Sequence, residues 1–392
     1  ANARVVARAF DMNHYNLTGT NTPPLSSSWS GPVSLLHLLS LPDLVVTEIM
    51  YHPAPEPGNT NDAELYEYIE LLNRGTNTLN LAGFRFTQGI DFVFPSLDLA
   101  AGQRVLVVRD RAAFEFRYGT NRLIAGAFTN QLNNAGERLV LAGPLGEPIL
   151  DFTYNNNWYP ATDGLGFSLV ITDEQAPLAG WNNRLNWRVS SALQGSPGAT
   201  DGTPPPIPLV LVNEVLANTD PPQYDTVELY NPGPTPADIG GWFLTDDKDQ
   251  PKKMRIPQGT LVPPNGYVTF DESSFTNLGP DSFRFSSEGD SVWLFSGDAQ
   301  TNLTGYAHGF AFGASAKGTS FGRHVTSDGR ELFVAQAELS LGTNNAGPRV
   351  GPVVINEIMP DPLPVYLDHD NTRDEYVELR NITLCPVHLY DP

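Results

Sequence analysis

Carboxylate side chains recur in pairs along this sequence, and paired carboxylates can perform acid–base chemistry or bind a cation. The pairs are Glu48 with Glu70, Glu214 with Glu228, and Glu357 with Glu378. Each pair lies in two short strings that are similar in all three places, so one chain carries the same arrangement three times. Three copies of a scaffold in one chain are simpler to account for than three copies of an active site. The recurrence therefore favours a structural role, in which the glutamates bond to a turn or to an arginine.

A second set of oxygen-bearing side chains lies near the end of the chain, in the string LDHDNTRDEYVEL. Asp368, Asp370 and Asp374 alternate there with Asn371 and Glu375, and oxygen ligands at this spacing suit a hard cation such as calcium. The string lacks the glycine and the spaced terminal glutamate of the twelve-residue calcium loop, which favours a solvated acidic loop. If this loop does bind a metal, we expect calcium, with Asp368, Asp370 and Asp374 as its ligands. Otherwise we expect no cofactor.

Two catalytic motifs can be set aside. GTSFG at 318–322 fits G-x-S-x-G around Ser320, but a nucleophile elbow needs a strand-to-helix turn. The repeat counterpart of this string, GLGFSLV, has no such pattern. The seven histidines show neither H-x-x-x-H nor H-E-x-x-H spacing, which gives a zinc enzyme no support. We therefore expect no catalytic residue and no enzymatic activity in this segment.

Charge and composition exclude several classes of partner. The formal net charge is −21, from 23 Lys and Arg residues against 44 Asp and Glu residues. Such acidity repels phosphate backbones and anionic membranes, so we expect no nucleic-acid partner. No run of residues approaches the roughly 18 apolar residues of a membrane span. The single Cys385 excludes an intramolecular disulfide and a cysteine-based zinc site.

Internal repeats organise the chain. Three segments begin alike, with LVVTEIMYHP at 44–53, VLVNEVLANTDPP at 210–222 and VVINEIMPDP at 353–362. Each is followed by a second shared string, which ends at Asn73, Asn231 or Asn381. Later strings also correspond, and GLGFSLVI at 164–171 aligns with GTSFGRHV at 318–325. The repeats are domain-sized, so each describes a whole folding unit.

Within each repeat the local signals are those of strands. Runs such as RVLVV at 104–108 and SVWLF at 291–295 are rich in β-branched and aromatic residues and are bounded by turn residues. The 35 Gly and 34 Pro residues disfavour helix interiors. Only RAAFEFRYG at 111–119 looks helical, for one or two turns. Many short strands without helical periodicity predict an all-β fold of tandem β-sandwiches.

The repeats and the Pro- and Gly-rich linkers divide the chain into four parts. We expect the C-terminal hairpin of an upstream β domain at 1–40, a first sandwich at 44–200, a second at 209–347 and the truncated start of a third at 353–392. Two strands cannot bury a sandwich core, so we expect 353–392 to be poorly packed unless it docks on the second sandwich. Because the chain starts at Ala1 without a Met and ends abruptly at Pro392, we interpret it as a segment of a longer protein.

The repeated motifs resemble those of the lamin-tail domain, an immunoglobulin-like β-sandwich. In the second repeat the resemblance rests on Asn213 and Glu214, on VELYN at 227–231 and on Gly241 and Trp242. In the first repeat Thr47 and Phe84 replace the more usual Asn and Trp. The string NWRVSSALQGSPG at 186–198 is similar to the terminal strand and Pro-Gly exit of the family.

The resemblance implies tandem non-catalytic modules of a bacterial exported protein, which are typically appended to hydrolases, nucleases or CotH-type kinases. We expect an extracellular or cell-surface segment that acts as a spacer or attaches to other proteins or cell-surface components. Two alternatives stay open: an accessory region of an exported CotH-type kinase or hydrolase, and a calcium-dependent adhesion module. Polysaccharide is a further candidate partner, because tryptophans can stack on sugars, although a core role is more common. The tryptophans concerned are Trp158, Trp181, Trp187, Trp242 and Trp293.

Overall fold

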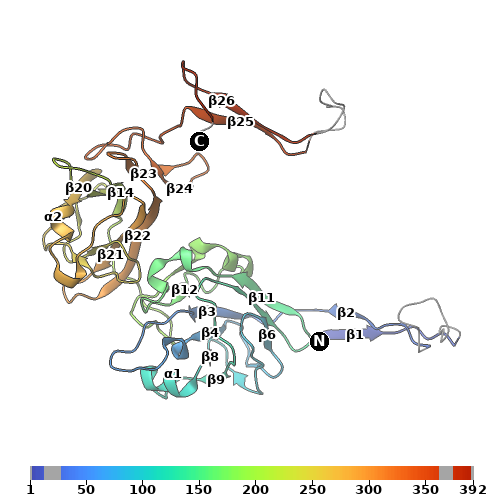
Figure 1. Cartoon of the computed structure of the whole chain (residues 1–392). Helices are drawn as coiled ribbons and strands as arrows, with labels where there is room; N and C mark the ends of the chain where they lie inside the picture. The colour runs from blue at the N-terminus through green and yellow to red at the C-terminus, as the bar shows by residue number, and fades with distance from the viewer. Residues whose placement is uncertain (1, 13–27, 362–373, 390–392) are drawn as a thin grey trace. The chain divides into compact units, whose positions relative to one another are not determined.

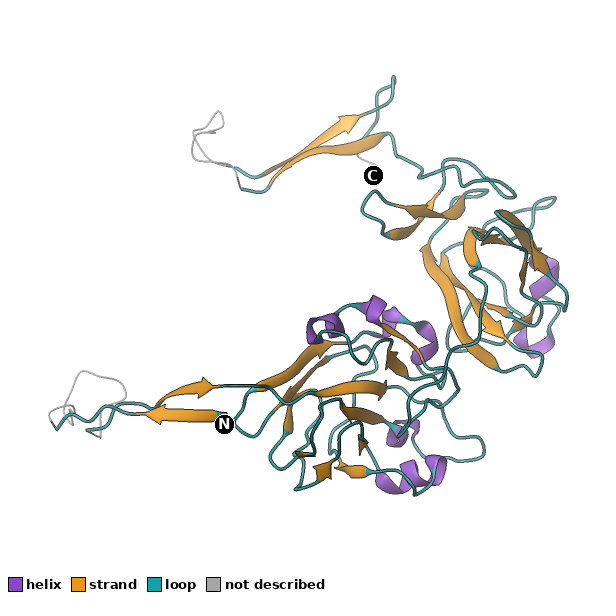
Figure 2. Ribbon diagram, turned by 180° about the vertical axis from the view of Figure 1, so that it is seen from behind, coloured by secondary structure: helices purple, strands orange, loops and turns teal. Residues whose placement is uncertain are grey.

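The computed structural model describes residues 2–12, 28–361 and 374–389. The chain forms two compact units, one of residues 1–207 with 295–307 and one of residues 208–294 with 308–392. Strands supply most of the regular structure, and the helical segments between them are short (Figure 1, Figure 2). The expected all-β class of tandem immunoglobulin-like β-sandwiches is confirmed.

The first sandwich is built on a six-stranded sheet of order β13-β12-β3-β4-β8-β9. Its strands span Trp187–Val189 (β13), Leu169–Ile171 (β12), Leu44–Met50 (β3), Tyr68–Asn73 (β4), Arg104–Val108 (β8) and Ile124–Ala127 (β9). The second layer is a three-stranded sheet of Pro148–Thr153 (β11), Arg138–Ala142 (β10) and Arg85–Gln88 (β6). Leu79–Asn80 (β5) and Asp98–Leu99 (β7) form a short pair. All these pairings are antiparallel except that of β8 with β9.

Both faces of the six-stranded sheet are buried. The inner face shares a core with the three-stranded sheet, to which it contributes Ile49, Ile69, Leu71, Val105 and Val107. On the outer face a second cluster comprises Met50, Tyr68, Leu106, Val108 and Phe114. Successive side chains of a strand point to opposite faces, so Glu48 and Glu70 lie on the outer face with this second cluster. The fold therefore places these two carboxylates where something must cover them.

Helix α1, Arg111–Tyr118, supplies part of that cover and confirms the predicted helical segment. The Asp110 side chain accepts the Ala113 N–H at its start, and Gly119 ends it with a φ of 80°. The remaining helical turns of this unit are Ala63–Tyr66 (η1), Asn156–Trp158 (η2), Pro160–Thr162 (η3), Leu178–Asn182 (η4) and Arg184–Asn186 (η5).

The second sandwich repeats this plan. Its larger sheet has the order β20-β15-β14-β23-β24, with strands Gly266–Asp271, Thr226–Asn231, Leu211–Leu216, Ser320–Val325 and Glu331–Ala335. The other layer has the order β18-β17-β21-β22, with strands Met254–Arg255, Phe243–Thr245, Gly289–Gly297 and Leu303–Gly313. Ala237–Asp238 (β16) pairs with Leu261–Val262 (β19), and the helical turns are Glu272–Phe275 (α2) and Gly279–Asp281 (η6). Strands β14, β15, β20 and β23 thus take the places of β3, β4, β8 and β12.

Three of the five tryptophans weighed as sugar platforms belong to the core. Trp181, Trp187 and Trp242 are all buried. The Trp181 Nε1–H donates to the Val46 carbonyl at 2.8 Å, and the Trp187 Nε1–H donates to the Trp181 carbonyl at 2.8 Å. The indoles of Trp181 and Trp187 therefore pack in the core of the first sandwich and do not face a ligand.

Two hairpins expose their apolar residues. Ala3–Ala7 (β1) pairs with Val33–His37 (β2), which confirms the two strands predicted in the first 40 residues. Val353–Met359 (β25) pairs with Tyr376–Asn381 (β26), and the side chains of Ile355, Ile358, Val377 and Leu379 are each more than half exposed. Among the described residues no helix is long and apolar enough to cross a membrane.

Candidate functional site

The paired glutamates occupy the same place in each repeat because the strands pair in the same register. Glu48 lies opposite Glu70 in β3–β4, Glu214 opposite Glu228 in β14–β15, and Glu357 opposite Glu378 in β25–β26. In every case a bulge in the first strand, just before its glutamate, shifts the register. Directly opposite side chains on one face are about 5 Å apart at Cβ, so each repeat brings two like charges together.

Glu48 is buried and is bound by several donors. Its Oε1 atom accepts hydrogen bonds from the Tyr68 hydroxyl at 2.6 Å, the Ser168 hydroxyl at 2.5 Å and the Ser196 N–H at 2.8 Å. Its Oε2 atom accepts the Ser196 hydroxyl at 3.1 Å. Such a set of donors compensates for the water that the carboxylate loses on burial.

Glu70 is bound in a parallel way. Its Oε1 atom accepts the Thr47 hydroxyl at 2.6 Å, and its Oε2 atom accepts the Gly198 N–H at 2.6 Å. The Arg104 Nη1 atom lies 3.6 Å from Oε1, while Nη2 bonds the Glu174 carboxylate at 2.7 Å. The two glutamates therefore share one covering segment, which contacts Glu48 through Ser196 and Glu70 through Gly198.

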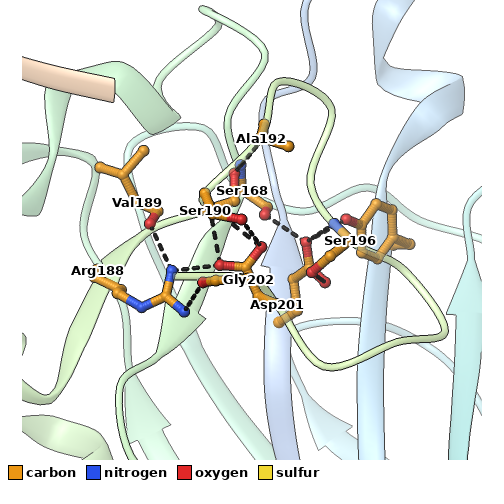
Figure 3. Close-up of polar contacts among 11 residues, drawn as sticks. Ser168, Arg188, Val189, Ser190, Ala192, Ser196, Asp201 and Gly202 are labelled. Carbon is orange, nitrogen blue, oxygen red and sulfur yellow. Dashed lines mark hydrogen bonds and ion pairs between the residues drawn. The ribbon is translucent and has the colours of Figure 1, made fainter. Parts of the chain in front are cut away.

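We call residues 190–202, which follow β13, the first exit strap. The strap is fastened at further points, as Figure 3 shows for its polar contacts. The Arg188 guanidinium bonds the Asp201 carboxylate and the Gly202 carbonyl, and the same carboxylate accepts the Ser191 N–H. Arg104 Nη2 also donates to the Thr200 hydroxyl at 2.7 Å. Residues 196, 198 and 200 thus contact side chains of β3, β4 and β8, which are neighbours in the sheet.

The second sandwich has an equivalent strap, residues 336–346, which we call the second exit strap. Glu214 accepts the Ser340 N–H at 3.0 Å and the Ser340 hydroxyl at 2.7 Å. Glu228 accepts the Gly342 N–H, and the Tyr267 hydroxyl of β20 donates to Asn344 at 2.9 Å. The spacing of Ser340, Gly342 and Asn344 therefore matches that of residues 196, 198 and 200.

In the third repeat the glutamates are exposed and keep only the contacts made within the hairpin. The Tyr376 hydroxyl donates to Glu357 at 2.8 Å, as Tyr68 does to Glu48. The Asn356 side chain donates to Glu378 at 2.5 Å, as Asn213 does to Glu228. The hairpin alone thus reproduces the strand-to-strand part of the site.

Burial sets the electrostatics of the two covered pairs. It raises the pKa of Glu48, and it raises the pKa of Glu70 to about 8, with repulsion from Glu48 adding to the effect. Burial likewise raises the pKa of Glu228 to about 7. A raised pKa is a common mark of an active-site carboxylate, but it also arises in structural networks. Here both carboxylates of each covered pair are almost fully buried and directed at the strap, so no substrate can reach them.

Two serines of the site could not be located from sequence. The Ser320 hydroxyl donates to Glu214 at 2.5 Å, as Ser168 does to Glu48. Leu169 pairs with Ile49, and Phe321 pairs with Val215, so Ser168 and Ser320 are equivalent. The alignment of GLGFSLVI with GTSFGRHV is therefore wrong by two residues. Ser320 begins strand β23, not a strand-to-helix turn.

The asparagine that ends each second strand holds a turn. Asn73 Nδ2 donates to the carbonyls of Asn77 and Leu99 at 2.9 Å, while its Oδ1 accepts the Gly75 N–H at 3.0 Å. Asn231 makes the same kind of contacts. Asn381 bonds the Cys385 carbonyl at 2.7 Å and accepts the Thr383 N–H at 2.9 Å. A side-chain amide whose oxygen and nitrogen are both hydrogen-bonded to the backbone fixes the path of the chain that leaves the strand.

The acidic loop of the third repeat falls largely outside the described residues. Asp368 and Asp370 lie there, and Asp374 lies two residues before the start of β26 at Tyr376. Within the part of the chain that the structure describes, no three or more His, Cys, Asp or Glu side chains are grouped as a metal site. Calcium binding by these three aspartates stays a prediction.

A family model described as Lamin Tail Domain matches residues 40–156 and 203–309. The resemblance inferred from the motifs is confirmed for these two ranges. Comparisons with curated proteins and with solved structures gave no match. The matched ranges end before β12 and β23, although these strands complete the large sheets and the exit straps follow them. The contacts to the glutamates therefore join each matched range to the chain that follows it.

Proposed function

Because the chain belongs to the lamin tail domain family, whose model covers more than half of it, we propose that it is a non-catalytic spacer and attachment segment. The segment belongs to an extracellular or cell-surface protein, and it holds neighbouring domains or partner proteins at a distance from one another. The net negative charge supports an extracellular or cell-surface location, since it keeps an exposed protein surface soluble and repels anionic polymers.

The exit straps are the observation that carries the proposal. The chain enters the first sandwich through β3, and it leaves through the strap that Glu48 of β3 binds at Ser196. Ser196 and Glu48 are 148 residues apart in sequence, so these bonds join the two ends of the folded unit. A pull on the chain at both ends loads hydrogen bonds to a buried carboxylate, which are among the stronger ones in proteins. The second strap joins Ser340 to Glu214 in the same way.

Stretching single molecules of the full chain tests this function. We expect two discrete unfolding steps, one per sandwich, and little lengthening before the first step. Each step should release about 3.3–3.6 Å per residue of the unit that unfolds. Gradual extension without discrete steps would contradict a spacer.

A variant with one altered strap provides an internal control. Ser196→Ala removes one hydroxyl from Glu48 and should lower the force of one step only. The other step should keep its force, because the second strap is unchanged. If the strap bears no load, both steps of the variant should keep the wild-type force. That result would leave the spacer function in place but show that the strap is not its basis.

A further inference from the structure

One edge of the larger sheet in the second sandwich is open, whereas the equivalent edge in the first sandwich is covered. In the first sandwich β9 pairs in parallel with β8. The Leu106 N–H donates to the Leu123 carbonyl, and the Phe128 N–H donates to the Val108 carbonyl, both at 2.9 Å. In the second sandwich β20 takes the place of β8 and ends the sheet, because β15 is its only strand partner within the part of the chain that the structure describes.

The length of the connecting chain explains the difference. Residues 109–137 join β8 to β10 and provide both α1 and β9, whereas the shorter segment 272–288 joins β20 to β21 and provides only the helical segments α2 and η6. After α2 the chain turns into the core, where the buried rings of Phe283 and Phe285 pack against Phe275. The shorter connection therefore has no strand to pair with β20.

The register shows which backbone groups point to the open edge. Thr269 lies opposite Glu228, as Leu106 lies opposite Glu70. Leu106 uses its N–H to bond the chain of β9, and every second residue of a strand directs its N–H and carbonyl to the same side. The residues of β20 that offer backbone groups at the open edge are therefore Tyr267, Thr269 and Asp271.

Strand β20 lacks the features by which proteins protect a free sheet edge. It pairs with β15 without a bulge, contains no Pro or Lys, and its run GYVTFD is rich in strand-forming residues. It is also held in place on both faces. Phe270 is buried, Tyr267 stacks on Tyr230 with ring centroids 4.9 Å apart, and the Tyr267 hydroxyl donates to Asn344 at 2.9 Å. Such a strand is preorganised to accept another strand.

We propose that an extended segment of a partner protein adds to β20 as a parallel strand, in the way that β9 adds to β8. Strand β9 shows which chemistry fits this place, since its residues 124–127, IAGA, are small or apolar. Asp271 is exposed at the end of the edge and the chain has a net charge of −21, which favours a segment that carries Lys or Arg. Binding at this edge rests on the attachment role proposed above and gives that role a site.

Fluorescence anisotropy with a labelled peptide of residues 121–130, which contain β9 and Arg122, tests the proposal on the full chain. The peptide should bind at one site per chain. The same peptide with Ala125→Pro should bind at least about tenfold more weakly, because proline removes a strand N–H. Amide hydrogen exchange should slow at Thr269 and Asp271 when the unaltered peptide is added, since their N–H groups then become bonded. No binding, or binding without this slowing, would overturn the proposal.

A matched pair of variants locates the site. Thr269→Pro removes one N–H from the open edge, a change that an edge strand tolerates, and should weaken peptide binding at least about tenfold. Thr269→Val keeps the N–H and should leave binding unchanged. Equal binding by the two variants would reject the edge as the site. If Thr269→Pro fails to fold, the exchange measurement on the unaltered chain decides.

Sedimentation velocity distinguishes a partner segment from a second copy of the chain. A dimer that forms without peptide, and that Thr269→Pro dissociates, would show that a second copy occupies the edge and would overturn the proposal. A chain that stays monomeric until peptide is added retains it. The two unfolding steps of a stretched molecule do not depend on this edge, so loss of peptide binding and loss of the spacer function can be told apart.

Discussion

Replacing Glu70 with glutamine is expected to remove part of the pH dependence of the stability of the first sandwich, the remainder coming from other buried carboxyls such as Glu48. The pKa of Glu70 is raised from 4.5 to about 8, so the folded state holds a proton that the unfolded state releases near pH 4.5. Such a group stabilises the fold fully below pH 4.5, and this stabilisation is lost as the pH rises through about 8. Wild-type stability should therefore fall between pH 5 and pH 9.

The magnitude follows from the size of the shift. A change from 4.5 to about 8 is about 3.5 pKa units, which corresponds to about 5 kcal/mol. This value is an upper limit, because relaxation and water entry reduce the cost of a buried charge. A glutamine at position 70 can accept the Gly198 N–H and donate to the Thr47 hydroxyl, so it keeps the shape of the site at every pH. We expect the variant to match the wild type at pH 5 and to exceed it by about 2–5 kcal/mol at pH 9.

Denaturant unfolding of the full chain at a series of pH values measures this difference. Glu115→Gln, at an ion-paired position on the surface of α1, serves as the control and should keep the wild-type slope. A wild-type first transition that is independent of pH between 5 and 9 would refute the reasoning. So would a Glu70→Gln variant that keeps the wild-type slope, since the titrating group would then lie elsewhere.

Three further outcomes are expected. Gly195→Ala should destabilise the first sandwich by more than about 3 kcal/mol in denaturant unfolding, since Gly195 has a φ of 77° and an added Cβ would lie 2.2 Å from the Tyr68 hydroxyl. Asn73→Ala should cost about 2–3 kcal/mol of stability, because it leaves buried carbonyls unbonded, whereas Asn381→Ala in the exposed hairpin should leave both melting transitions unchanged. Amide hydrogen exchange of the strands within 353–381 should be much faster than that of the covered strands, and equal protection would show that the hairpin is docked.

Much of the fold follows from local sequence. Short runs of β-branched residues and turn residues predict the strands, and the string RAAFEFRYG at 111–119 predicts α1, because these signals act over a few residues. The threefold repeat also predicts that the glutamates are paired, since equal strings form equal strand pairs. These features need no knowledge of distant contacts.

The partners of the glutamates were decided by the tertiary structure. Ser196 and Gly198 lie 148 and 128 residues from the carboxylates that they bind, and a strap of irregular chain carries no periodic signal. Only the strand register shows that Ser168 and Ser320 are equivalent. The segment that connects β11 with β12 differs in length from the segment that connects β22 with β23, so the sequence alone does not align the two serines.

The same limit applies to the contact of Glu64 with Asn134, whose side-chain amide donates to the Glu64 carboxylate at 2.8 Å. Asn134 and Glu64 are 70 positions apart, and only folding brings the amide of one to the carboxylate of the other. Local sequence dictates the strands, the repeats and which carboxylates lie side by side. Burial decided which of those carboxylates hold the chain in place, because the covering segments are fixed by packing and not by local preference.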